Sequence, residues 1–254
     1  MLTKFPLSFL LPLLSLTCFY SLAATKLPID SKKIFPEFSA QYTVLHKSSP
    51  VGSAIRSLSY QADGSIDYHY KTEVEWLIFS QTRSETSILS IESNKVIPQH
   101  YTYTREGTGK DKRYEWRYNS VTGEAKDIER KRDHQIDFSN NLQDKLSYHL
   151  QHRLNLMANA NQTSYIYPVI NTSGSIKDYV YENDGEEELM LPYGLIKTIR
   201  FKREVKEKER VTYAWFAPEL DYLLVKLYQT KGGTEQFEAQ LSSLTIEGKD
   251  VKKL

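Results

Sequence analysis

Apolar and polar residues alternate strictly through much of the chain. The clearest example is IDYHYKTEVEW at 66–76, where every second residue is apolar or threonine and the residues between are charged or histidine. Residues 113–118 and 211–215 alternate in the same way. A period of two puts one set of side chains in a core and the other in water, as in an antiparallel sheet. The pattern therefore predicts a mainly β protein.

Turn signals separate these segments and predict how the strands connect. They are Asp63-Gly64, Gly107 to Gly109, Thr122-Gly123, Asp184-Gly185 and Gly232-Gly233. Such pairs favour hairpins, and we expect about a dozen strands. Near the C-terminus Phe237 and Leu241 share one parity, whereas Leu244 has the other. A bulge near Ser242-Ser243 would restore the inward face and bend the strand, which indicates a curved antiparallel sheet or partial β-barrel.

One segment has a helical period instead. In SNNLQDKLSYHLQHRLNLM at 139–157, leucines recur every four residues from Leu142 to Leu154. Asn140 stands where an N-cap is expected, with Gln143 three residues later. The pattern predicts one long amphipathic helix packed on the sheet. No long linker or internal repeat divides the chain, so we expect a single α+β domain, mainly β, over 24–254.

The N-terminus has the anatomy of a secretory signal peptide. Lys4 precedes an apolar run from Phe5 to Tyr20, which is shorter than the roughly 20 residues that cross a bilayer. Small residues follow at Ser21 and Ala23. We expect export and removal of residues 1–23, with no transmembrane segment left after cleavage.

Cys18 is the one cysteine in the sequence. A bacterial lipoprotein is cut just before the cysteine that carries its lipid, but Ser15-Leu16-Thr17 departs from the usual residues of that signal. We therefore expect Cys18 to leave with the signal peptide. The mature chain would then have no disulfide, no thiol nucleophile and no thiolate metal site.

Charge narrows the class of partner. Without Lys4, the 33 basic residues become 32, against 32 acidic ones. A formally neutral chain is not drawn to nucleic acid or anionic lipid by its net charge, and no nucleic-acid partner is predicted.

No familiar catalytic motif is present: the sequence has no GxSxG, P-loop or HExxH pattern. His149 and His152 could share a helix face, but the other histidines lack ligand spacing, so no metal and no cofactor are predicted. Glu186 and Glu188 would share one side of a strand, with Glu187 on the other. A solvated hairpin edge accounts for this acidic cluster, and no catalytic residue is assigned.

Aromatic residues on the alternating segments are the feature with most functional potential. The chain has 18 tyrosines, and tyrosine favours half-buried pleated surfaces. The inner side of a curved sheet would carry Tyr68, Tyr70, Trp76, Tyr114, Trp116, Tyr213 and Trp215. Such a face makes an apolar ligand pocket if it is incompletely filled, and an ordinary core against the helix if it is filled.

The run WFAPELDY at 215–222 reads as a strand, a proline corner and a returning strand. With 83–85, 144–147 and the turn at 191–194, it resembles a family of exported Gram-negative proteins known as domain of unknown function number three-one-zero-eight. Family members usually carry proline where this chain has Leu224. The resemblance spans most of the mature chain and implies a periplasmic, β-rich single domain without established catalytic residues. The architecture also looks like the half-barrel of periplasmic lipoprotein carriers.

The leading hypothesis is a non-enzymatic periplasmic protein that binds an apolar ligand, namely a lipid, an acyl chain or a lipidated envelope protein, or that serves envelope maintenance. One alternative is a structural or protein-interaction module of the cell envelope. Another is a hydrolase with an unrecognised site, for which Glu186, Glu188, His149 and His152 are the candidates.

Overall fold

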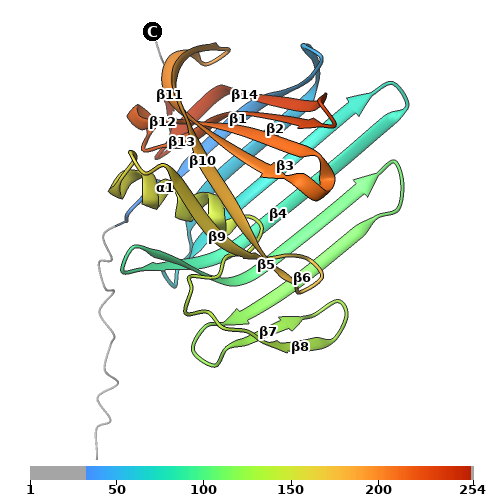
Figure 1. Cartoon of the computed structure of the whole chain (residues 1–254), viewed down its shortest axis with the longest axis vertical. Coiled ribbons are helices and arrows are strands. Elements are labelled where there is room, and N and C mark those ends of the chain that lie inside the picture. The colour runs from blue at the N-terminus through green and yellow to red at the C-terminus, as the bar shows by residue number, and fades with distance from the viewer. Residues whose placement is uncertain (1–32, 253–254) are drawn as a thin grey trace, which may run out of the picture. The chain divides into compact units, whose positions relative to one another are not determined.

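The computed structural model describes residues 33–252, which fold into one 15-stranded sheet around a single α-helix within that range (Figure 1). The mainly β prediction is confirmed. The expected signal peptide, its cleavage site and Cys18 lie outside the described residues.

The strands in chain order are β1 (Phe38–His46), β2 (Ser49–Tyr60), β3 (Ile66–Trp76), β4 (Phe79–Glu92), β5 (Lys95–Gly107), β6 (Lys112–Asn119), β7 (Glu124–Asp127), β8 (Arg132–Gln135), β9 (Ser164–Ile170), β10 (Ile176–Leu191), β11 (Gly194–Val205), β12 (Arg210–Ala217), β13 (Leu223–Lys231), β14 (Thr234–Ile246) and β15 (Lys249–Val251). The helix α1 (Ser147–Ala158) lies between β8 and β9, and short 3-10 turns follow β11 (η1, Lys206–Lys208) and β12 (η2, Pro218–Leu220).

Two meanders form the sheet. The order is β8-β7-β6-β5-β4-β3-β2-β1-β14-β13-β12-β11-β10-β9, with β15 paired to β14, and every strand pairing is antiparallel. Most neighbours in the sheet are therefore neighbours in sequence, and the β1–β14 pairing joins the two halves of the chain. The end strands β8 and β9 do not pair with each other, so the sheet is not closed.

Side chains bring the two ends of the sheet together. Arg130 Nη1 donates to the carbonyl oxygen of Thr172 at 2.6 Å, linking the β7–β8 turn to the β9–β10 turn. Gly174 lies against the rings of Trp116 and His134, and an added Cβ there would be 3.2 Å and 3.1 Å from them. The gap between β8 and β9 is thus a seam of side-chain contacts without a strand ladder.

Gln143 connects the end strand β9 with β5 through its backbone and side chain. Its backbone N–H donates to the oxygen of Pro168, and its own oxygen accepts from the N–H of Ile170, both at 2.9 Å. Its side-chain Nε2 donates to the oxygen of Val96 on β5 at 2.9 Å. One buried residue therefore connects β9 with the opposite half of the sheet.

Bulges bend the strands, as one sequence pattern predicted. The β1–β14 register shifts between Gln41 and Tyr42, whose partners are Ser243 and Leu241, which leaves Ser242 as the extra residue. The predicted bulge is confirmed. The predicted turn at Asp184-Gly185 is wrong, because β10 continues through it with a register shift between Asn183 and Glu186. Gly185, at φ 96°, supplies the left-handed backbone that such a bulge uses.

The proline corner forms as predicted. β12 ends at Ala217, and Pro218 opens the 3-10 turn η2. Asp221 and Tyr222 then take left-handed φ values of 49° and 56° before β13 returns along β12.

The helix starts later than its leucine period predicts. α1 begins at Ser147, so the expected N-cap at Asn140 is wrong. Leu142 and Leu146 are buried, but Leu142 lies in the lead-in that pairs with β9 and Leu146 is the N-cap residue, in a turn before α1. The helical pattern fails there because the backbone of Gln143 is already paired with β9.

The helix is also more buried than an amphipathic surface helix. Nine of its 12 residues are buried. Two of its polar side chains are bonded inside the protein: Gln151 Oε1 accepts from the N–H of Val96 at 2.7 Å, and Arg153 Nε donates to the oxygen of Asp221 at 3.1 Å. The prediction of a long amphipathic helix is therefore not confirmed; α1 is a short interior helix. It contributes Leu150 and Leu154 to one core cluster, and Tyr148 and Leu156 to another.

Candidate functional site

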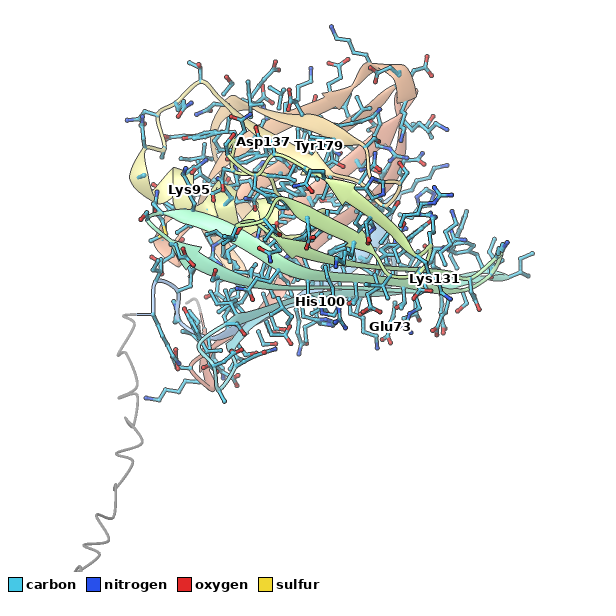
Figure 2. All side chains as sticks on the ribbon, turned by 90° about the horizontal axis from the view of Figure 1, so that it is seen from below. Glu73, Lys95, His100, Lys131, Asp137 and Tyr179 are labelled. Atoms are coloured by element: carbon cyan, nitrogen blue, oxygen red, sulfur yellow. The ribbon has the colours of Figure 1, made fainter. Side chains whose placement is uncertain are left out.

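Strand register arranges the inward side chains of β2 to β6 in rows. Arg56, Tyr70 and Glu85 stand opposite one another on β2, β3 and β4. Their row continues through Tyr103 and Tyr114. The adjacent row consists of Leu58, Tyr68, Ser87, Tyr101 and Trp116. The first row thus carries charges on the inner face of the sheet. In Figure 2, Glu73 and His100 lie on the side of this part of the sheet that faces away from Tyr179 of β10.

A cavity of about 860 Å³ lies over the charged row. Its lining comes from β2, β3 and β4, from β10 to β14 with the turn η1, and from the start of α1. We call this cavity the central cleft. Its volume is in the range of small-molecule sites, which hold about 300–1,000 Å³.

Arg56 is the most unusual residue of the central cleft. Its side chain is only 4% exposed, and its Nη1 donates to the hydroxyl of Tyr68 at 2.8 Å. The guanidinium carbon lies 5.1 Å from the ring centroid of Tyr70. Nε has no hydrogen-bond partner, and no carboxylate in 33–252 forms an ion pair with it. Arginine stays protonated when buried, so the cleft holds a positive charge without a counter-ion.

Other cations of the cleft share this lack of acidic partners. The Nε atoms of Arg83 and Arg203 are buried without a hydrogen bond. The guanidinium of Arg203 lies 4.0 Å from the ring centroid of Tyr179, and Nζ of Lys145 lies 5.3 Å from that of Tyr103. Arg83 Nη2 donates to Gln81 Oε1 at 3.3 Å, and its Nε stays free. Arg203 and Lys145 lie over aromatic rings, so each of the three cations keeps donors for an anion.

One buried carboxylate, that of Glu85, lines the cleft and accepts a hydrogen bond from a tyrosine. Glu85 Oε2 accepts from the hydroxyl of Tyr101 at 2.7 Å. The outer lining carries both signs, with Lys177, Lys206 and Lys208 beside Asp178 and Glu207. The excess of positive charge is therefore in the depth of the cleft.

His149 adds a neutral polar group to the cleft. Burial, followed by the positive charge of Arg56, holds the pKa of His149 well below its ordinary value. Its ring packs on Tyr148 at 4.1 Å between centroids, and its Nδ1 has no hydrogen-bond partner. A neutral imidazole offers one donor and one acceptor, so His149 can orient a ligand without adding charge.

Asp144 positions the start of the helix against the cleft. Its Oδ1 accepts from the N–H groups of Leu146 and Ser147 at 2.7 Å, and the hydroxyl of Ser147 accepts from the N–H of Asp144 at 2.9 Å. This is reciprocal capping. Its Oδ2 accepts from the hydroxyl of Ser87 at 2.5 Å. Burial raises the pKa of Asp144 to about 6, although these hydrogen bonds oppose the shift.

The seven aromatic residues predicted to bind a ligand do not gather in one place. Tyr70 lines the central cleft. Tyr68 and Trp116 are fully buried in the neighbouring row, and Tyr114 lies beside Tyr103 at 5.5 Å between ring centroids.

The other three lie elsewhere. Trp76 is half exposed at the end of β3. Tyr213 and Trp215 lie together on β12, 6.2 Å between ring centroids, and Trp215 Nε1 donates to Glu187 at 2.6 Å. A ligand role for this set stays a prediction.

The candidate hydrolase residues also differ in burial: the two histidines are buried and the two glutamates are exposed. His152 is buried among aromatic rings, where burial lowers its pKa to about 3. Glu186 and Glu188 are exposed on β10. Within residues 33–252 no group of three or more His, Cys, Asp or Glu side chains is placed to hold a metal ion.

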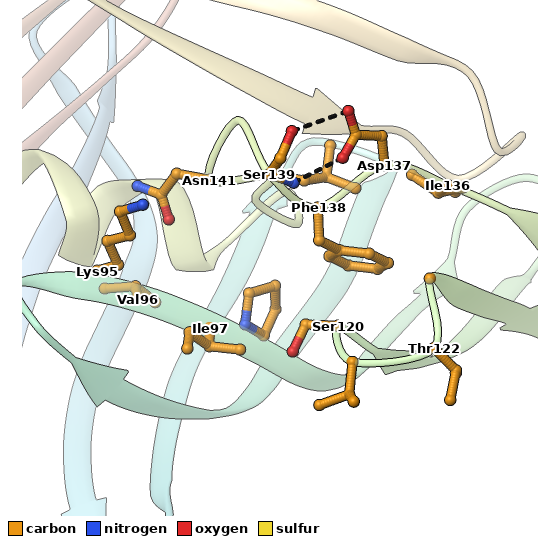
Figure 3. Close-up of a pocket in the computed structure, with 14 residues that line it drawn as sticks. Lys95, Val96, Ile97, Ser120, Thr122, Ile136, Asp137, Phe138, Ser139 and Asn141 are labelled. Carbon is orange, nitrogen blue, oxygen red and sulfur yellow. Dashed lines mark hydrogen bonds between the residues drawn. The ribbon is translucent and has the colours of Figure 1, made fainter.

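A second cavity, of about 460 Å³, lies between the start of β5, the β6–β7 turn and residues 136–142 (Figure 3). Its lining includes Val96, Ile97 and Phe138. Asp137 there accepts from the N–H and the hydroxyl of Ser139, both at 2.8 Å. Since this carboxylate is satisfied locally, the cavity lacks the unpartnered groups of the central cleft, and none of the seven predicted aromatic residues lines it.

Sequence reasoning missed Arg56, Arg83 and Arg203 as site residues. A signal for Arg56 was present: in Ala54-Ile55-Arg56-Ser57-Leu58 the arginine has the parity of the buried Ala54 and Leu58. A charged residue at an inward position of an alternating strand marks a site candidate.

Comparisons with known proteins agree with the fold. The family described as "Protein of unknown function (DUF3108)" matches residues 41–240. A crystal structure of a beta-barrel-like protein of domain of unknown function DUF1849 from Brucella abortus aligns with 84% of this chain and 98% of its own, at a TM-score of 0.54 and 10% identity. No curated protein matches the sequence. Among residues 33–252, no helix combines the length and apolarity needed to cross a membrane.

Proposed function

The chain belongs to the DUF3108 family, and we propose that it is an exported, periplasmic, non-enzymatic binding protein whose central cleft holds an acidic amphiphile. The acidic head group would contact Arg56, with Arg83 and Arg203 beside it. The acyl chain would follow the apolar lining.

The unpaired charge of Arg56 is the observation that supports an anionic ligand. A buried cation without a counter-ion costs several kcal/mol of desolvation. A phosphate or carboxylate in the cleft would offset this cost with charge-assisted hydrogen bonds. The unpartnered Nε atoms of Arg83 and Arg203 and the Nδ1 of His149 border the same cavity.

The apolar part of the lining supports an amphiphile over a small inorganic anion. Leu146, Val180, Leu227 and Phe237 line the central cleft together with several tyrosines. Burial raises the pKa of Tyr70, so its phenol stays neutral and offers a ring face. Cationic and apolar surfaces in one cavity match a ligand with an acidic head and a hydrocarbon chain.

Calorimetric titration with matched amphiphiles tests the proposal. We expect dodecyl phosphate, below its micelle concentration, to bind more tightly than dodecylphosphocholine, which has the same chain and a zwitterionic head. Arg56→Met should weaken dodecyl phosphate binding about tenfold or more, since a hydrogen bond to a charged group contributes about 1.5–3 kcal/mol.

Arg132→Met is the matched control, because Arg132 is exposed on β8 and outside the cleft. Equal binding of the two amphiphiles, or equal loss in both variants, would contradict the proposal. Native mass spectrometry of the protein purified from its own periplasm, before and after denaturation, would identify the natural ligand.

A further inference from the structure

The tip of the β3–β4 hairpin is a run of four exposed apolar residues. Trp76 is 50% exposed, Leu77 88%, Ile78 98% and Phe79 38%. Trp76 and Phe79 are cross-strand partners, and Leu77 and Ile78 form the two-residue turn between them. In Figure 1 this hairpin, in cyan, reaches the upper right of the molecule.

The turn chemistry at this tip is unusual. Leu77 has φ 54°, a backbone region that favours glycine. Four other two-residue turns of the described chain carry polar residues or glycine, namely Lys47-Ser48, Ser93-Asn94, Gly232-Gly233 and Glu247-Gly248. In the fifth, Pro192-Tyr193, the tyrosine is buried. Leucine therefore occupies a strained and solvated position for which a better turn residue exists, so the fold itself does not account for it.

Contacts hold the backbone of the hairpin, while the side chains of Leu77 and Ile78 at its apex are exposed. The ring of His46 packs on Trp76 at 5.0 Å between centroids. The N–H of Ser80 donates to the hydroxyl of Thr108 at 2.9 Å, and the N–H of Thr108 donates to the oxygen of Ser80 at 2.6 Å. The apolar apex therefore points outward, while contacts at Trp76 and Ser80 hold the strands below it.

The size and composition of the tip favour a lipid bilayer over a protein as its partner. A stable protein interface buries about 800 Å² on each side, and four side chains at a convex apex, two of them partly covered, supply less than that. A bilayer needs no shape complementarity. Aromatic residues below an aliphatic apex also match the interface, where tryptophan lies at head-group depth.

We propose that the β3–β4 tip inserts into the interfacial layer of a lipid bilayer, with Leu77 and Ile78 deepest. The neighbouring turns carry both signs of charge, with Lys47 and Lys110 near Glu75 and Asp111. Insertion is therefore driven by apolar burial and needs no anionic lipid.

Fluorescence with zwitterionic vesicles tests this proposal. Of the three tryptophans, Trp116 and Trp215 are buried and Trp76 is exposed. Phosphatidylcholine vesicles should shift the emission of Trp76 to the blue, and brominated acyl chains should quench it. Trp76→Phe should remove both signals.

The decisive variant is Leu77→Gly with Ile78→Asn, which places favourable turn residues at the apex. It should unfold at an unchanged or higher temperature, yet bind vesicles about tenfold or more weakly. Met190→Gln, at an exposed site on β10, should bind as the wild type does. Every protein is prepared in the same way, so that the N-terminal segment contributes equally.

Undiminished binding by the double variant, or no blue shift in the wild type, overturns the proposal. The outcome is independent of the central cleft. Arg56→Met should bind phosphatidylcholine vesicles normally, even if dodecyl phosphate fails to bind the cleft.

Discussion

Arg56 donates a hydrogen bond to the hydroxyl of Tyr68, and that neutral hydroxyl, 2.8 Å away, stands where a buried guanidinium would usually find a carboxylate. The pair leaves the charge of Arg56 uncompensated inside the protein. Buried charges without partners lower stability, so this arrangement predicts a conflict between stability and ligand binding at one residue.

Arg56→Met should not destabilise the ligand-free protein. Even replacing a whole buried ion pair by apolar residues is often neutral or stabilising by about 1–4 kcal/mol, and Arg56 has no ion pair to lose. The free energy of unfolding in urea, measured for Arg56→Met and for Arg56→Lys, checks this. A loss of more than about 3 kcal/mol in Arg56→Met would mean that Arg56 is part of the structural core.

His152 should make the protein less stable in acid. Its pKa is lowered by burial from 6.5 to about 3. Between these two pH values the unfolded chain binds a proton at His152 and the folded chain does not. Stability from this group is therefore lost as pH falls from 6.5 towards 3. Between pH 7 and about pH 4.5 the wild type should lose about 3 kcal/mol relative to His152→Phe.

The pH dependence of unfolding in the two proteins measures this difference. His152→Phe loses the hydrogen bond with Tyr167, which lowers its stability at every pH by a similar amount. The slope with pH is therefore the informative quantity. Parallel slopes would show that His152 is protonated in the folded protein.

Asp144 should make the protein less stable as pH rises, which is the opposite of the effect of His152. Its pKa is raised from 3.8 to about 6 by burial, so in this interval the folded chain holds a proton that the unfolded chain has lost. Its ionisation costs stability as pH rises from about 4 to 6, by about 3 kcal/mol in full above that range. Asp144→Asn keeps a capping side chain and should remove this dependence. Unfolding midpoints of both proteins across pH 4 to 7 give the comparison, and an unchanged slope would contradict it.

Gly52 should tolerate no side chain. An added Cβ would lie 2.0 Å from the oxygen of Glu73 on the neighbouring strand. Gly52→Ala must therefore push β2 and β3 apart and should cost about 2–4 kcal/mol. Gly64→Ala is the control, since nothing lies within 4 Å of its Cβ and only its φ of 85° opposes alanine, at about 1 kcal/mol. Thermal unfolding ranks the two, and equal losses would refute the steric explanation.

Alternation in the sequence predicted which residues face inward, but not what they do there. The parity of 66–76 placed Tyr68 and Tyr70 on one face, and the structure confirms it, with Tyr68 buried and Tyr70 in the cleft. The same parity rule applied to β2 would have found Arg56. The rule cannot tell that Arg56 forms no ion pair, because this depends on the hydrogen bonds made across the sheet, where Glu85 accepts from Tyr101 and Arg56 donates to Tyr68.

The helix begins later than its leucine pattern predicts because backbone pairing with a strand distant in sequence overrides that pattern. Leucines every four residues continue from Leu142 to Leu154, yet the first two lie outside α1. Backbone bonds between Gln143 and β9 hold the lead-in extended, and their partners, Pro168 and Ile170, are distant in sequence. The interior position of α1 also escaped prediction, since Gln151 and Arg153 find partners within the fold that are distant in sequence.

Because β8 and β9 meet through side chains without pairing, the sheet is an open barrel and not a closed one. A closed barrel can change its diameter only by breaking the hydrogen bonds between two strands. An open barrel can widen by losing side-chain contacts alone, such as that of Arg130 with Thr172 and that of Gln143 with Val96. Every strand pairing in the sheet survives such a widening. The sheet can therefore loosen around α1 without unravelling.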